Sequence, residues 1–255
     1  MRNSSQMPDF DDSTLWRISA YERMRLQRSG SVFAPLDDTT VLPTTMVAEL
    51  HHLDNPREGS DVLEVLAACV RHRQTALLCL RYDQYVWPVT VFPTDGVYHS
   101  PRDMSLASEE GLGAVRLVSC EPTGLRAPGH WMHERIGRPD HYRPLKSLLW
   151  SMALVGPRGA LLKQISGHAA YRSTLSDDMR PATPGALASA ADRLRRETAP
   201  VRDMARWPGM SVERACRLLN ALYLASGLIV MRTHHAARDE PQTLAGRLGI
   251  GKTRR

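Results

Sequence analysis

Polar side chains that could contact nucleic acid or a partner protein recur near the C-terminal end of the sequence. Arg214, Arg217 and Asn220 follow one another at three-residue spacing. This spacing places them on one face if the stretch is a helix. Guanidinium and amide groups bind base edges and phosphates, and they also form hydrogen bonds at protein interfaces. Leu224 adds apolar surface to this face, which favours a protein partner.

The residues around this face predict three helices and a strand. We expect helices over 184–198, with Thr183 as the cap, 200–207 and 211–226, and an extended run over 228–234. Ser211 is a good N-cap for the third helix, and Gly227 is its predicted stop. The Pro208-Gly209 pair predicts a turn between the second and third helices. We therefore expect a separate C-terminal domain over residues 183–240.

The stretch VRDMARWPGMSVERACRLLNALYLASGLIV, residues 201–230, resembles the helix-turn-helix and strand of bacterial winged-helix domains. The resemblance rests on a short helix, a turn, a longer helix and the Gly-Leu-Ile that begins the strand. It implies that helix 211–226 is the recognition helix if the domain binds DNA, with Arg206, Arg232 and Arg238 holding phosphates. The wing lacks a return strand, because acid, proline and glycine follow in DEPQTLAGRLG. Loss of the wing fits an interaction or dimerisation module.

A second group of reactive side chains lies in the middle of the chain. His130, His133, Glu134 and His141 could bind zinc, but their spacing does not match a recognised metal site. Together with Cys120 they are also the residues that an enzyme pocket would have to gather. The sequence contains no G-x-S-x-G nucleophile elbow. We therefore predict no catalytic residue and no bound metal.

The sequence GRLGIGKT, residues 246–253, matches the phosphate-loop pattern G-x-x-x-x-G-K-[ST]. That motif binds phosphate only when a strand precedes the loop and a helix follows it. Neither is indicated here, because only Arg254 and Arg255 follow Thr253. We expect a basic, flexible tail over 241–255 and no nucleotide or other cofactor.

Composition limits the class of protein. The chain has 255 residues, 42% of them hydrophobic and 24% charged, which is typical of a folded globular protein. Its net charge of +6 agrees with an acidic partner or nucleic acid, although no run of five Lys or Arg occurs. The N-terminal sequence lacks the apolar core of a signal peptide, and ALYLASGLIVM is too short to span a bilayer. We expect a cytoplasmic protein without a membrane segment.

The first two thirds of the chain predict an α+β domain over 44–171, preceded by an arm over 1–43 with a helix at 13–28. Helices are expected at 44–53 and 60–73, where Asp61 and Glu64 form a capping-box pattern. Alternating or β-rich apolar runs predict a small antiparallel sheet with strands at 75–81, 85–92, 97–100 and 113–120. Pro88 inside the second run predicts an edge or bulged strand, because proline has no N–H to donate.

Two more helices are expected to close this domain. Leu145, Leu148, Leu149, Met152 and Val155 form an apolar stripe over 143–156, and Pro157 occupies a favourable first-turn position for a helix over 157–171. We expect a long loop over 122–143, and a linker over 172–182, which is polar and contains two prolines. The four cysteines lie in apolar runs and are expected to be buried thiols.

These patterns support three hypotheses of function. The first is a non-enzymatic cytoplasmic regulatory or adaptor protein that acts through protein contacts or self-association. The alternative is a DNA-binding transcription regulator that reads DNA with helix 211–226. In both, the contact residues are expected to be Arg206, Arg214, Arg217, Asn220, Leu224 and Arg232. The third is an enzyme with a pocket around the central histidines.

Overall fold

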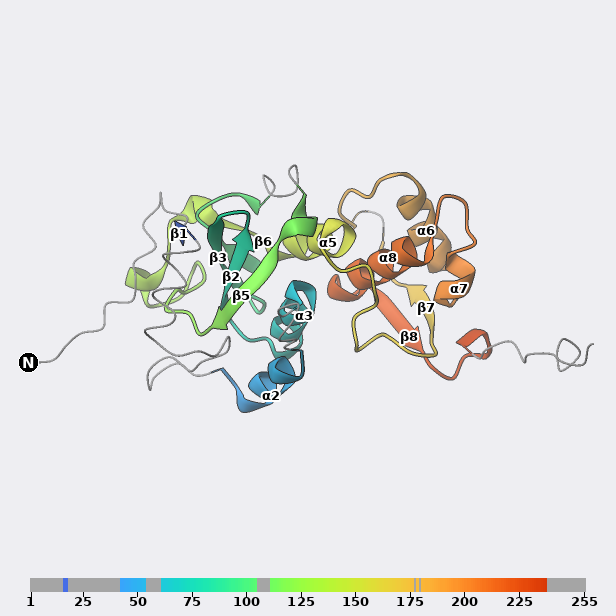
Figure 1. Cartoon of the computed structure of the whole chain (residues 1–255), viewed down its shortest axis with the longest axis horizontal. Helices are drawn as coiled ribbons and strands as arrows, with labels where there is room; N and C mark the ends of the chain where they lie inside the picture. The colour runs from blue at the N-terminus through green and yellow to red at the C-terminus, as the bar shows by residue number, and fades with distance from the viewer. Residues whose placement is uncertain are drawn as a thin grey trace, which may run out of the picture.

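The computed structural model describes residues 16–17, 42–53, 61–104, 111–176, 178 and 180–237. Figure 1 shows an elongated molecule with an antiparallel sheet at one end and a group of helices at the other. We call residues 42–156 the sheet region, residues 170–237 the helical region, and the connecting residues 157–169 the strap. The predicted α+β class is confirmed. The predicted arm helix and the basic tail lie outside the described residues, except that Trp16–Arg17 form the short strand β1 instead of helix.

The sheet is built around one hairpin. Strand β2 (Ala76–Tyr82) pairs with β3 (Tyr85–Phe92), and Asp83 and Gln84 form the turn. The predicted strand over 85–92 is confirmed at both ends. Strands β4 (Val97–His99), β5 (Arg116–Glu121) and β6 (Tyr142–Pro144) complete the order β5-β2-β3-β4-β6, and β1 also pairs with β3. Strands β2 and β3 are buried along most of their length.

The prediction that Pro88 marks an edge or a bulge in β3 holds only locally. Strand β3 is internal, with β2 on one side and both β1 and β4 on the other. Strand β1 pairs with Tyr85 and Val86, and β4 pairs with Thr90 to Phe92. Among the described residues, none pairs with Pro88 on that second side. The missing N–H therefore falls between two short neighbouring strands, where no ladder bond is lost.

Three helices accompany the sheet. Helix α2 (Thr44–Leu53) has the predicted bounds, and α3 (Val62–His72) begins after Asp61, whose carboxylate accepts from the N–H groups of Leu63 and Glu64. Helix α5 (Leu145–Val155) buries most of its predicted stripe. The predicted loop over 122–143 is more ordered than expected, because it contains two short 3-10 helices, His133–Arg135 and Pro139–His141, and the start of β6.

The predicted helix over 157–171 is absent. Residues 157–169 contain no helix and instead form the strap, which leads into strand β7 (Ala170–Ser173). Leu162 and Ile165 of the strap are fully buried in the hydrophobic core. Gly167 has a φ of +90°, which residues with a side chain rarely adopt. Tertiary contacts therefore override the local helical pattern here.

The helical region is closed by two strands that are distant in sequence. Strand β7 pairs antiparallel with β8 (Leu228–Met231). The sequence between these two strands forms three helices: α6 (Gly185–Arg196), α7 (Val201–Met204) and α8 (Val212–Leu224). Residues 172 and 173 of the predicted linker belong to β7, so a division at residue 172 would cut this strand. Helix α8 ends before the predicted stop, and the residue with left-handed backbone is Ser226 rather than Gly227.

One continuous hydrophobic core joins the two regions. It includes residues of α3, the sheet and α5, then the strap, and then α6 and α8. Helix α5 lies between the sheet and α8 and packs along α8 (Figure 1). Among the described residues, no helix is both long and apolar enough to cross a membrane.

Candidate functional site

The start of helix α8 is exposed, as expected of a contact surface. The Ser211 hydroxyl accepts a hydrogen bond from the Arg214 N–H at 3.2 Å, which confirms the predicted N-cap. Arg214 is exposed in the first turn. Arg206, in the turn before α8, has 74% of its side chain exposed and lies 3.7 Å from Asp203. These two arginines are available to a partner.

The later turns of α8 are buried, which contradicts the predicted outer face. Asn220 is 0% exposed and Leu224 only 5% exposed. Helix α8 packs against α5 as well as α6, α7 and β8, so the face expected to meet solvent is covered. The Asn220 side chain accepts from the Leu162 N–H and donates to the Ala160 carbonyl, both at 2.9 Å. Asn220 therefore holds the strap and does not contact a partner.

Arg217 and Arg232 are also bound within the molecule. Arg217 pairs with Glu213 at 2.9 Å and donates to the carbonyl groups of Leu154 and Gly156 at the end of α5. A cation at this position stabilises the carbonyl end of a helix. Arg232 donates to the carbonyl groups of Ser166 and Gln164 in the strap, at 2.8 and 2.9 Å. Of the six predicted contact residues, Arg206, Arg214 and Arg232 are exposed, Arg217 is half-buried, and Asn220 and Leu224 are buried.

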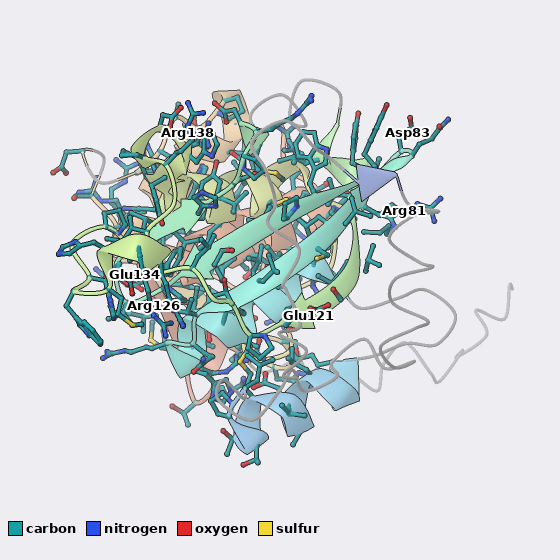
Figure 2. All side chains as sticks on the ribbon, turned by 90° about the vertical axis from the view of Figure 1, so that its left-hand side faces the viewer. Arg81, Asp83, Glu121, Arg126, Glu134 and Arg138 are labelled. Atoms are coloured by element: carbon teal, nitrogen blue, oxygen red, sulfur yellow. The ribbon has the colours of Figure 1, made fainter. Side chains whose placement is uncertain are left out.

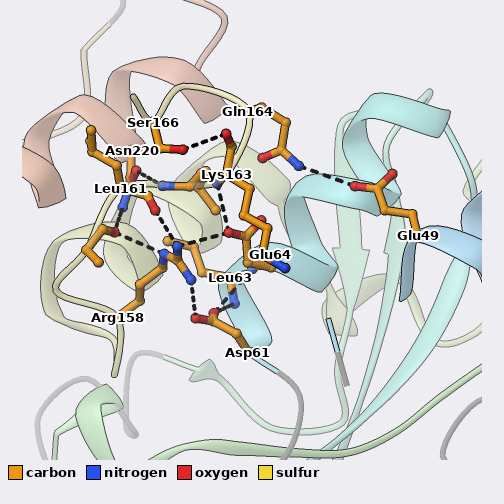
Figure 3. A network of polar contacts seen from close by, with 12 residues as sticks. Glu49, Asp61, Leu63, Glu64, Arg158, Leu161, Lys163, Gln164, Ser166 and Asn220 are labelled. Atoms are coloured by element: carbon orange, nitrogen blue, oxygen red, sulfur yellow. Dashed lines mark hydrogen bonds and ion pairs between the residues drawn. The ribbon is translucent and has the colours of Figure 1, made fainter. Parts of the chain in front are cut away.

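A polar network holds the other side of the strap (Figure 3). The Arg158 guanidinium lies 2.5 Å from the Asp61 carboxylate and 3.0 Å from Glu64 Oε1. Glu64 is 1% exposed, and its Oε1 also accepts from the Lys163 N–H at 2.9 Å. The sequence pattern had suggested that Glu64 would cap its own helix, whereas it binds the strap. A buried carboxylate is tolerated because a cation and an N–H share it.

A second group of contacts extends this network to α2. Glu49 binds Arg71 and lies 2.9 Å from His72 Nε2, both on α3. Gln164 of the strap donates to Glu49 at 3.2 Å. The strap is therefore attached to α2, α3 and α8 at once. These contacts are structural, and none of them forms an open site.

The central histidines and cysteines do not gather into one reactive site. His141 is buried beside His99, with 5.4 Å between ring centres, while His133 is exposed. Cys120 is buried, and a hydrogen bond with the Cys69 thiol together with burial raises the pKa of Cys120 well above its usual value. A thiol with a raised pKa is a poor nucleophile. Among the described residues, no group of three His, Cys, Asp or Glu is placed to hold a metal ion.

The most exposed large apolar side chain among the described residues is Trp131, at 76%. It lies in the segment 122–141, where the sequence showed prolines, glycines, histidines and arginines. The His130 ring stacks against the indole, with 5.7 Å between ring centres. The sequence pattern indicated the neighbouring histidines as candidate site residues and did not indicate this tryptophan. A large aromatic residue between turn-forming residues was the signal that could have indicated it.

The loop that carries Trp131 is held by hydrogen bonds on both sides. The Arg126 N–H donates to the Arg135 carbonyl at 2.8 Å, which closes the base of the loop. The Tyr142 hydroxyl donates to the Arg126 carbonyl at 2.6 Å and accepts from the Gly137 N–H at 2.9 Å. The N–H of Met132 donates to His130 Nδ1 at 3.1 Å. The indole is thus presented by a fixed backbone.

Charged side chains of both signs surround this loop. Residues 121–140 contain three arginines, Arg126, Arg135 and Arg138, and three acidic residues, Glu121, Glu134 and Asp140, and Asp140 lies 3.2 Å from Arg138. Figure 2 faces this end of the molecule and places Arg126, Glu134 and Arg138 on one side of it, with Arg81 and Asp83 on the other. An exposed indole among arginines is the composition of an interface centre, because Trp and Arg are enriched among the residues that contribute most to binding. We refer to residues 124–138 as the Trp131 loop.

Comparisons with known proteins add no family to this description. No protein-family model matches the chain, and no match was found among curated proteins or solved structures.

Proposed function

We propose that this chain is a non-enzymatic, cytoplasmic regulatory or adaptor protein that acts through protein contacts and carries a winged-helix-like C-terminal module. The observation that supports this proposal is Trp131, which is 76% exposed on a loop held by hydrogen bonds. An exposed indole keeps a large apolar area in water, and a partner that covers it gains the free energy of burial. The fixed backbone reduces the entropy lost on binding.

The experiment compares partner capture by the native chain and by two matched variants. Trp131→Ala removes the exposed indole, and Tyr85→Ala removes another exposed aromatic side chain, 40% exposed, at the start of β3. Each tagged protein is used to enrich partners from the native lysate, with quantitative mass spectrometry as the readout. We expect at least one partner whose enrichment falls by about tenfold or more in Trp131→Ala and is unchanged in Tyr85→Ala. Equal capture by all three proteins would contradict the proposal.

DNA binding is a second candidate, supported by the charge of the helical region. Residues 183–237 contain eight arginines and four acidic residues. Because Asn220 and Leu224 are buried, a DNA contact would use Arg206 and Arg214 rather than the later turns of α8.

Anisotropy titrations with labelled genomic DNA fragments test this alternative. Binding that weakens by orders of magnitude between roughly 50 and 200 mM salt, and that falls further in Arg206→Ala with Arg214→Ala, would support it. Absence of binding at the lower salt concentration would exclude it in favour of the protein-contact function.

A further inference from the structure

A cavity of about 230 Å³ lies beside the start of α5, away from the Trp131 loop. Its polar lining consists of Tyr98 of β4, Asp103 in the segment after β4, Arg143 of β6, and Ser147 and Ser151 of α5. The last three residues follow at four-residue spacing, so Ser147 and Ser151 share one face of the helix. Met104, Leu112 and Leu148 supply an apolar wall. None of these residues belongs to the proposed contact surface.

Arg143 is fixed in position, and its ion pair with Asp103 is longer than a hydrogen bond. Its Nη1 donates to the carbonyl groups of Ser100 and His141, at 3.0 and 3.2 Å. Its Nε lies 3.7 Å from Asp103 Oδ2, which is longer than a hydrogen bond. The Arg143 side chain is 24% exposed and that of Asp103 is 47% exposed. A ligand carboxylate could therefore approach the guanidinium and compete with Asp103 for it.

The start of α5 adds to the positive potential of the cavity. Pro144 stands at the N-cap and has no side chain that can accept from the first N–H groups of the helix, although the Leu145 N–H already donates to the Gly96 carbonyl at 2.9 Å. The N-terminus of a helix carries partial positive charge and favours an anion. Burial raises the pKa of Tyr98 to about 12, so its phenol stays neutral at physiological pH. The guanidinium, the helix N-terminus and the serine hydroxyls all suit one negatively charged group.

We propose that this cavity binds a small organic acid, with its carboxylate at Arg143 and the start of α5 and its short apolar body against Met104, Leu112 and Leu148. The size of the cavity sets the size of the ligand. A volume of about 230 Å³ is below the usual range for drug-sized ligands and corresponds to roughly seven or eight water molecules. A ligand of about six to nine non-hydrogen atoms matches it.

Calorimetric titration of the full chain with butyrate and benzoate tests the proposal, with butyramide and benzamide as uncharged partners of the same shape. We expect the acids to bind at least about tenfold more tightly than the amides, because a charged hydrogen bond to Arg143 is lost in the amide. Failure of both acids to bind at roughly 10 mM, or equal affinity of acid and amide, would overturn the proposal.

Two variants and one control variant separate a ligand contact from a structural role of Arg143. Arg143→Met should weaken acid binding by about tenfold or more, whereas Arg81→Met, an exposed arginine on β2, should leave it unchanged. Asp103→Asn removes the competing carboxylate and should tighten acid binding. Weaker binding in Asp103→Asn would contradict the proposal even if Arg143→Met fails to fold.

Discussion

The β2–β3 hairpin and the strap are held in place by opposite means. In the hairpin, Ala76 to Tyr82 pair residue by residue with Tyr85 to Val91, so backbone N–H and carbonyl groups of the two strands bond to each other. In the strap, backbone groups are bound by side chains from α3, α8 and the segment after β8, by Arg158 within the strap, and by Tyr171 just after it. A ladder spreads its stability over many equal bonds. The strap depends on a few polar side chains.

This difference predicts where the molecule is sensitive to substitution. Loss of one side chain in a hairpin leaves its main-chain bonds intact. Loss of one side chain around the strap leaves a buried donor, acceptor or charge without a partner, which costs more than the bond itself contributes. Four predictions test the comparison, and each uses the free energy of unfolding measured in urea unless stated otherwise.

The largest effect is expected for Arg158→Met. It leaves Glu64, 1% exposed, as a buried carboxylate without its cation, and should lower the free energy of unfolding by about 3–5 kcal/mol. Adding Glu64→Gln should restore part of this loss, because the amide is neutral and its oxygen still accepts from the Lys163 N–H. If the double variant were no more stable than Arg158→Met, the unpaired charge would not be the cause.

Asn220→Ala should destabilise the protein by about 2–3 kcal/mol. It leaves the Leu162 N–H buried without its acceptor, while the Ala160 carbonyl keeps its bond from Arg158. Arg214→Ala, on the same helix but exposed, is the control and should change stability by less than about 0.5 kcal/mol. Hydrogen exchange should show faster exchange in the strap than in the hairpin in Asn220→Ala. Equal changes in both segments would contradict the comparison.

Alkaline pH should weaken the attachment of the strap through Tyr171. Its hydroxyl donates to the Ile165 carbonyl at 2.6 Å, and burial raises the pKa of Tyr171 to about 12. Because the folded pKa exceeds the unfolded value of about 10, this stability is fully present below pH 10 and is lost as the pH rises toward 12. The loss should be about 2 kcal/mol. Tyr171→Phe should flatten the decline, and an unchanged decline would contradict this assignment.

The smallest effect is expected in the hairpin turn. Asp83 has a φ of +52°, which is less strained for aspartate than for alanine. Asp83→Ala should lower the free energy of unfolding by about 1 kcal/mol, and Asp83→Gly should be nearly neutral because glycine adopts this conformation freely. A loss in Asp83→Ala as large as that in Arg158→Met would remove the contrast between ladder and strap.

Local patterns in the sequence predicted the elements whose hydrogen bonds are formed by residues close to one another in the sequence. Helix α2 and strand β3 have the predicted bounds, and the N-caps at Asp61 and Ser211 are confirmed by hydrogen bonds. In each case, the signal and the bonds lie within a few residues of each other. The four cysteines were expected to be buried thiols, and they are.

The features that the sequence did not predict lie where distant segments of the chain meet. The strap has the apolar spacing of a helix, but side chains such as Asn220 and Arg232 take its carbonyl groups. Helix α8 was expected to have one solvent face, because its sequence does not show that α5 packs against it. The cavity had no sequence signal, since Tyr98 and Arg143 come together only through the pairing of β4 with β6.

The pairing of β7 with β8 also orders events during synthesis. Strand β7 emerges from the ribosome long before its partner, and Ala170–Ser173 can form no ladder until Leu228–Met231 has been made. The contacts of the strap with Asn220 and Arg232 form only after those residues have been made, whereas its contacts with α2 and α3 can form earlier. Nascent chains that end before residue 220 should therefore hold a formed sheet and a strap attached on one side only, more open to proteases and chaperones than in the finished protein.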